Sequence, residues 1–265
     1  MKYVILLLFA ADTVVAQSSV LGQSDARAKK IIDDAIQALG GSAFLEMQDR
    51  VETGRAYSYY REQISGLTDA KIYTRYLSVP PSQTGSVLGE RERMAYGVRE
   101  DAFDLYREDG AWEVSWRGAR AMDNERITRF KDTTLRNIFY ILRMRLKEPG
   151  MIFEYRGSDV FDNLPVDKVD ITDSEDRVET VYFHQSSKLP VRQSFKWLDE
   201  KMHQQNEEVT VFTRYLEAGG VIWPHGIHRE RNGDKIFEIF STKVTIDQGL
   251  ADNLFSLAVG VKTLK

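Results

Sequence analysis

The histidines at positions 225 and 228 are the residues whose type and spacing first suggest chemistry in this chain. They lie in GVIWPHGIHRERNGDKIFEI, from Gly220 to Ile239, and on a helix their spacing would bring two imidazoles together. The segment instead alternates on both sides of Asn232-Gly233, a favoured two-residue hairpin turn. Side chains three positions apart in a strand point to opposite faces. We therefore predict a structural hairpin without a metal site.

Other patterns that signal catalysis are missing from the sequence. It contains no G-x-S-x-G elbow, phosphate loop, dinucleotide fingerprint or H-E-x-x-H motif. The remaining two histidines lack a partner pattern, and we interpret the acidic pairs Asp101/Asp104 and Asp173/Asp176 as solvated turn carboxylates. We assign no catalytic residue, no metal ligand and no cofactor, and we do not expect an enzyme.

The composition excludes several classes of protein. The chain has 265 residues and a net charge of −4, which argues against a nucleic-acid-binding surface. Its aromatic content of 11% is too high for a disordered chain. It has no cysteine, so disulfides, thiolate metal sites and the acylated cysteine of a lipoprotein are all excluded.

The first 16 residues resemble an export signal. Lys2 supplies a basic start, VILLLFAA is a short apolar core, and Val14 and Ala16 suit the positions before a cleavage site. The apolar run is too short to span a bilayer comfortably. We predict a signal peptide over 1–16, a single domain over 17–265, no integral membrane segment in the mature chain and a periplasmic location.

Two segments have helical periodicity. The first begins at Ser24, which can cap it, and ends at Gly40-Gly41. The second runs from Asn124 to about Lys147 and is apolar nearly all round in its second half. We expect these helices to cover one face of a sheet.

Most of the remaining chain alternates with period two, and after the second helix the alternating segments come about 10–14 residues apart with turns between them. This rhythm is typical of an antiparallel meander. The sequence therefore predicts an α+β protein that is mostly β, with two or three helices on the concave face of a strongly curved antiparallel sheet.

Aromatic residues are dense on the predicted strands. They have two interpretations, an ordinary packed core or an apolar cavity between sheet and helices. The cavity interpretation assigns the ligand contacts to inward strand positions and to the apolar half of the second helix. The candidate ligand-binding residues are Tyr57, Tyr59, Trp112, Val114, Trp116, Phe139, Leu142, Phe195 and Trp197.

Three segments resemble the LolA/LolB-like family of periplasmic outer-membrane lipoprotein-sorting proteins. They are AKKIIDDAIQALGGSAFLEMQDRVETGRA, RVETVYFHQSSKLPVRQSFKW and GGVIWPHGIHRERNGDKIFEIFSTKVTIDQGLADNLFSL, the last ending in Asp252, Leu254 and Phe255. The resemblance implies an unclosed half-barrel of about eleven strands. It also implies an apolar cavity that holds acyl chains. The chain departs from the carriers in one respect, because no single arginine of this sequence matches their lid arginine.

The resemblance favours a periplasmic carrier that binds the acyl chains of lipoproteins or lipids for transfer toward the outer membrane. The alternative is a periplasmic regulator that binds an envelope protein partner, an RseB-like use of the same scaffold. An open apolar cavity favours the carrier. A filled core with an exposed apolar patch favours the regulator. In either case we expect a monomer.

The export signal generates the first prediction. We expect residues 1–16 to be removed, so that the mature chain begins at Gln17. N-terminal sequencing of the protein from the periplasmic fraction tests this directly. An intact Met1 in the membrane fraction would instead indicate an uncleaved anchor.

Overall fold

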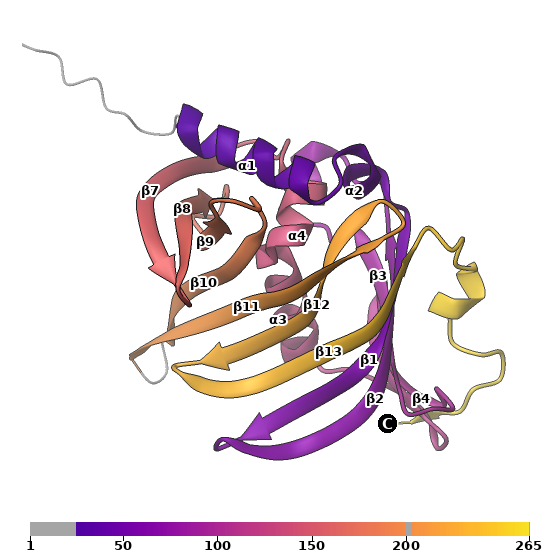
Figure 1. The fold of residues 1–265 in the computed structure, drawn as a ribbon. Helices are drawn as coiled ribbons and strands as arrows, with labels where there is room; N and C mark the ends of the chain where they lie inside the picture. The colour runs from indigo at the N-terminus through magenta and orange to yellow at the C-terminus, as the bar shows by residue number, and fades with distance from the viewer. Residues whose placement is uncertain (1–24, 200–202, 265) are drawn as a thin grey trace, which may run out of the picture.

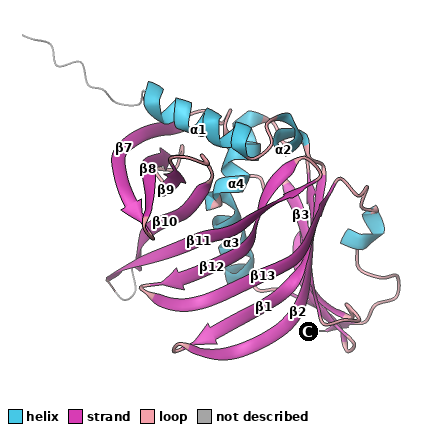
Figure 2. Ribbon diagram, viewed as in Figure 1, coloured by secondary structure: helices cyan, strands magenta, loops and turns pink. Residues whose placement is uncertain are grey.

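One curved sheet dominates the computed structural model, which describes residues 25–199 and 203–264 (Figures 1 and 2). In the described residues it has fourteen strands in the order β14-β6-β5-β4-β3-β2-β1-β13-β12-β11-β10-β9-β8-β7. Neighbouring strands are antiparallel, except that β14 pairs parallel with β6. The end strands β14 and β7 do not pair with each other within the described residues, so the barrel is unclosed.

The strand bounds fall into two halves of the chain. The first half contributes β1 Asp49–Tyr60, β2 Gln63–Tyr76, β3 Glu90–Tyr96, β4 Ala102–Arg107, β5 Gly110–Ser115 and β6 Gly118–Ala121. The second half contributes β7 Ile152–Phe161, β8 Leu164–Thr172, β9 Val178–His184, β10 Pro190–Asp199, β11 Gln204–Ala218, β12 Val221–Arg231, β13 Asp234–Ile246 and β14 Thr263–Leu264.

The helices lie at one end of the sheet and within its curve (Figures 1 and 2). They are α1 Ala26–Ala38, α2 Ser42–Glu46, α3 Asn124–Arg136 and α4 Ile138–Tyr140, and α4 continues into a π-helical turn, Ile141–Arg145. The largest apolar core joins α1, α2, α4 and this turn to the inner face of the strands. Smaller 3-10 turns span Pro81–Gln83 and Asp252–Phe255.

The expected fold class is confirmed, with more strands than the eleven that the resemblance implies. Among its fourteen strands are two short ones, β6 and β14, of four and two residues. A strand this short has too few positions for alternation to be recognised in the sequence. The predicted first helix is also present, but Asp25 caps it by accepting hydrogen bonds from the backbone of Arg27 and Ala28. Ser24 lies outside the described residues.

The predicted hairpin around Asn232-Gly233 is confirmed as β12 and β13. Both turn residues have positive φ, 54° and 86°, as a type I′ turn requires. His225 is buried, and its Nδ1 lies 3.0 Å from the backbone oxygen of Ser241. The Nδ1 of His228 lies 2.7 Å from Glu238 Oε1. The two imidazoles therefore have separate partners rather than a shared site.

The second predicted helix is wrong as a continuous element, because it breaks at Asn137. This residue has an extended backbone, with φ −64° and ψ 127°, and its side chain accepts hydrogen bonds from the backbone of Phe139 and Tyr140. An asparagine side chain competes with the helical backbone in this way. Gln193 of β10 completes the break by accepting from the backbone of Ile138 at 2.9 Å.

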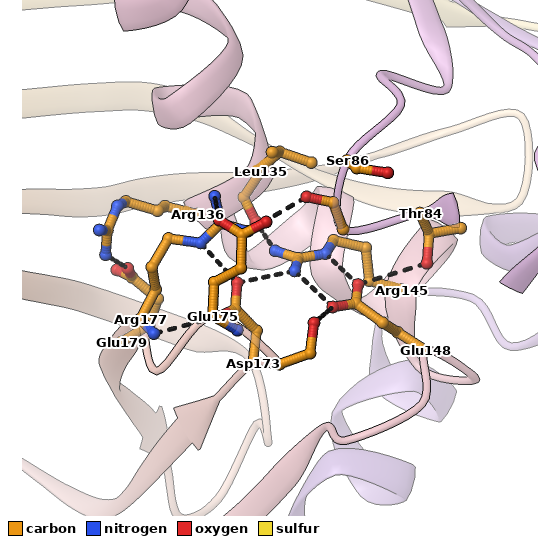
Figure 3. Close-up of polar contacts among 12 residues, drawn as sticks. Thr84, Ser86, Leu135, Arg136, Arg145, Glu148, Asp173, Glu175, Arg177 and Glu179 are labelled. Atoms are coloured by element: carbon orange, nitrogen blue, oxygen red, sulfur yellow. Dashed lines mark hydrogen bonds and ion pairs between the residues drawn. The ribbon is translucent and has the colours of Figure 1, made fainter. Parts of the chain in front are cut away.

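A buried ion cluster fixes α3, α4 and the π-helical turn, together called the inner helices, to the sheet (Figure 3). The Arg145 side chain is 1% exposed and donates to Glu148 Oε2 at 2.7 Å and to Asp173 Oδ2 at 2.8 Å. Arg145 also donates to Glu148 Oε1 at 2.9 Å and to the backbone oxygen of Leu135, near the end of α3. Asp173 is thus not a solvated turn carboxylate. Burial raises the Asp173 pKa, but hydrogen bonds from Arg145 and Arg177 outweigh burial and lower it overall.

Within the described residues, no helix is long and apolar enough to cross a membrane. The predicted signal peptide and its cleavage site at Ala16 lie outside the residues that the structure describes.

The ion cluster predicts a large loss of stability in Arg145→Met. Glu148 and Asp173 would lose their buried partner, and the free energy of unfolding should fall by about 3–5 kcal/mol. The matched control is Arg129→Met, because Arg129 is 61% exposed and pairs with Glu125 at the surface. Surface pairs contribute about 0–1 kcal/mol. Urea unfolding measures both variants, and equal losses would contradict the structural role of Arg145.

Candidate ligand-binding cavity

A cavity of about 350 Å³ lies between the concave face of the sheet and the inner helices. Strands β1 to β4 form one wall, and β10 to β13 form the other. Side chains of α3, Asn137 and α4 cover it. The break at Asn137 separates α3 from α4, and the stacked rings of Phe130 and Tyr106, 3.6 Å apart, join α3 to β4.

The apolar part of the lining comes mainly from β12, β13 and the helices. Phe139 of α4 packs edge-on against Phe212 at 4.9 Å and lies 4.8 Å from Trp223. These rings separate the cavity from the main core, which contains all three. The apolar lining side chains are Ile72, Met94, Phe130, Phe139, Phe195, Trp223, Ile227, Phe237 and Ile239.

The charged part of the lining comes mainly from β1 to β4. In antiparallel strands, residues opposite each other share a face, and the register places Glu92 opposite Thr74, which lies opposite Arg50. The next inward row runs from Met94 to Ile72 and on to Glu52 in the same way. The charged lining side chains are Arg50, Glu52, Glu90, Glu92, Asp104 and Arg229. The cavity is therefore amphipathic, whereas the sequence predicts an apolar one.

Arg50 is held rigidly in this wall. It donates to the hydroxyl of Tyr76 at 3.0 Å and to Thr74 Oγ1 at 3.1 Å, and its guanidinium lies 4.1 Å over the Trp223 ring. Burial lowers the Arg50 pKa, but the opposing effects of Tyr76 and the Glu52 carboxyl are together larger, so the net shift is upward. Arg50 therefore remains a permanent positive charge at the boundary of the charged and apolar walls.

Glu90 and Glu92 both carry strongly raised pKa values. For Glu90, burial is the larger cause and the neighbouring Glu92 adds to it, giving a pKa of about 8. For Glu92, burial again dominates and gives a pKa of about 7. Arg50 and Arg143 lower the Glu90 pKa, but by less than burial raises it. Arg50 likewise lowers the Glu92 pKa, whereas Glu52 and Asp104 raise it. Both carboxyl groups are thus largely protonated in slightly acidic solution.

Two of the residues chosen from the sequence, Phe139 and Phe195, line the cavity. Trp197 lies two residues beyond Phe195 on the same strand face, with ring centroids 5.5 Å apart, but is not part of the lining. Leu142 is fully buried in the main core beside the cavity. The helix break turns the apolar second half of the segment partly into core and partly into cavity wall.

Tyr57 and Tyr59 lie on the outer face of β1. Tyr57 contacts the Phe240 ring edge-on at 5.9 Å, and the Tyr59 hydroxyl donates to the carboxylate of Glu238. The inward face of β1 carries Arg50, Glu52 and the small Ala56. Alternation separates the two faces of a strand without showing which is inside, and the larger apolar side chains here lie outside.

Trp112 and Val114 also lie on the outer face, and Trp116 is 82% exposed. Trp112 is opposite Leu105 in the register, and both belong to a cluster that the C-terminal segment covers with Phe255. The sequence gives no sign that a distant segment covers the outer face of β4 and β5. These residues therefore lie away from the cavity for a tertiary reason.

The sequence interpretation missed the acidic wall. Glu90 and Glu92 lie in ERERMAY, where the alternation of the sequence indicates a strand but no site. Glutamates and arginines alternate in this segment, so both faces of the strand carry charged side chains. The sequence alone therefore does not distinguish inward acids from surface ones. Asp104, interpreted as a turn carboxylate, lies in β4 and lines the cavity, where burial raises its pKa.

The fold is similar to those of several solved structures. A DUF1329 family protein from Desulfovibrio piger has TM-score 0.57 and 13% identity, and an outer membrane lipoprotein-sorting protein domain from Vibrio parahaemolyticus has 0.56 and 13%. A LolA superfamily protein from Nitrosomonas europaea has 0.52 and 9%. Each match covers 86% of this chain and 97% of the other. No protein-family model and no curated protein sequence matches the chain. The comparisons show a LolA-like fold.

The acid pair predicts an unusual dependence of stability on pH. The ordinary carboxyl pKa is 4.5, and in the folded protein it rises to about 8 for Glu90 and about 7 for Glu92. Folding therefore favours proton uptake, and the stabilising contribution is present below pH 4.5 and lost as the pH rises to about 8. We expect the melting temperature to fall between pH 5.5 and 8.5.

The double variant Glu90→Gln/Glu92→Gln removes both titrations. It should give a flatter profile and a higher melting temperature than the wild type at pH 8.5, by several degrees. Glu230→Gln is the matched control, because Glu230 adjoins the lining residue Arg229 in β12 and points to the opposite face. Identical profiles for the wild type and the double variant would show that the two carboxyls are not perturbed.

Proposed function

We propose that the protein is an exported periplasmic carrier that binds an acyl chain of a lipid or lipoprotein in the cavity between the sheet and the inner helices. The observation that carries this proposal is the cavity of about 350 Å³, with an apolar wall from β12 and β13, in a LolA-like fold. The solved relative from Vibrio parahaemolyticus is described as a lipoprotein-sorting domain. The continuous sheet supports a single binding domain.

The cavity volume sets the size of the cargo. A water molecule occupies roughly 30 Å³ of the liquid, so 350 Å³ has room for about twelve groups of that size. This fits one chain of about twelve carbons rather than several chains. Burying twelve methylenes contributes about 10 kcal/mol gross, before an association cost of about 4–15 kcal/mol. At the low end of that cost about 6 kcal/mol remains, a dissociation constant on the order of tens of micromolar, which suits a carrier that must release its cargo.

The regulator alternative has less support. A regulator would be expected to have a filled core and an exposed apolar patch. The tip of the β1–β2 hairpin does expose Tyr60, Ile64 and Leu67. The interior, however, contains open space lined by side chains of both walls. A failure to bind any alkyl chain would move the balance toward a protein partner at the hairpin tip.

Filling the cavity is the direct test of the carrier. Ile227 lines it from β12, so Ile227→Trp should occupy the space and weaken binding of a fluorescent acyl probe at least about tenfold. The control is Ile64→Trp, the same exchange at a site 59% exposed in β2. Thermal melts of both variants show whether the fold survives, since overpacking costs typically 1–3 kcal/mol. Undiminished binding in a folded Ile227→Trp variant would place the acyl chain elsewhere.

A further inference from the structure

Two carboxyl groups of the cavity wall have no cation within ion-pair distance among the described residues, although the more distant Arg50 lowers the pKa of both and Arg143 that of Glu90. Every other charged side chain in the lining is paired with an opposite charge: Glu52 with Arg50 at 3.7 Å, Asp104 with Arg126 at 3.3 Å and Arg229 with Glu208 at 3.2 Å. Among the described residues, neither the Glu90 nor the Glu92 carboxyl has a hydrogen-bond or ion-pair partner. Glu90 is only 7% exposed and Glu92 is half-buried, and both side chains line the cavity.

This pair has an unmet need for donors or positive charge. A buried carboxylate without a partner is costly, and it resolves this by keeping a proton or by meeting a cation. Glu90 and Glu92 are two positions apart in β3, so they share a face and are about 7 Å apart along the strand. An ammonium group donates three hydrogen bonds, so a single one placed between the two side chains can reach both.

The apolar surface begins directly beside the acid pair. Met94 follows Glu92 on the same face of β3 and lies opposite Ile72 of β2, and both line the cavity. A ligand held by its head at the acids would therefore lay its chain over Met94 and Ile72 toward Ile239 of the far wall, which belongs to the same apolar cluster. The volume of about 350 Å³ allows one such chain.

We propose that the ligand is a single alkyl chain with a primary ammonium group, held at its head between Glu90 and Glu92. The inference deepens the proposed carrier function and depends on it. An anionic head would face two acids with no free cation among the charged lining residues, because Arg50 and Arg229 are already engaged. A hydroxyl head donates one hydrogen bond and brings no charge, so it satisfies at most one carboxyl group.

Three probes with the same chain test the head group separately from the chain. Dodecylamine, dodecanol and dodecanoate are titrated calorimetrically at pH 7.5, below their micellar concentrations, into the wild type and into Glu90→Gln/Glu92→Gln. The variant preserves the size of both side chains and removes their charge. Glu230→Gln controls for a general loss of negative charge, and butylamine tests whether a free amine suffices.

We expect the wild type to bind dodecylamine at least about tenfold more tightly than dodecanol, as a charge-assisted hydrogen bond gives. Dodecanoate should bind more weakly than both. The double variant should lose the preference for the amine while binding dodecanol as the wild type does, and Glu230→Gln should retain it.

Each contrary outcome has a distinct meaning. If dodecanol binds but the amine has no advantage, or if its advantage survives in the double variant, the head-group inference is overturned and the carrier function stands. If butylamine binds as tightly as dodecylamine, the site takes a free amine and the alkyl chain is not part of recognition. If no twelve-carbon probe binds the wild type, the proposed function fails, and the inference fails with it.

Discussion

The buried guanidinium of Arg145 is the interaction on which the cavity depends. It joins the end of α3, through the Leu135 carbonyl, to Glu148 and to Asp173 at the turn after β8. A sheet this curved needs something in its concave face, and a continuous apolar helix would fill it as core. The ion cluster instead fixes one end of the broken helix, and Asn137 redirects the chain so that α3 covers the cavity and α4 enters the core.

Charge distribution then distinguishes this cavity from a simple apolar container. Its two walls come from different halves of the chain, with the acids on β3 and β4 and much of the apolar surface on β12 and β13. Those halves meet where β1 pairs with β13, so Arg50 and Glu52 lie at the junction. In the proposed complex the head of the amphiphile lies at the acids and its chain points toward the far wall. The proposal thus assigns the container to the fold and the selectivity to the inward residues of β3.

Local sequence rules predicted much of the fold. Alternation located the long strands, and Asn232-Gly233 identified the β12–β13 hairpin, because both signals depend on neighbouring residues alone. The inner face of each strand was not predictable in this way. Ala56 points inward while Tyr57 points outward, and Trp112 is covered by a C-terminal segment far away in sequence. The helix break depended on Gln193, a residue of another strand, and the acid pair was recognisable only once β3 had a defined inside.

The most direct test of a carrier is what the protein retains when it is offered a natural mixture. The mature protein is incubated with a lipid extract of its host envelope, separated from free lipid and measured by native mass spectrometry. The account predicts a one-to-one complex whose added mass is that of one single-chain amphiphile, and Ile227→Trp should not form it. A wild-type protein that stays unliganded throughout, beside a positive control carrier that takes up lipid from the same extract, would contradict the account.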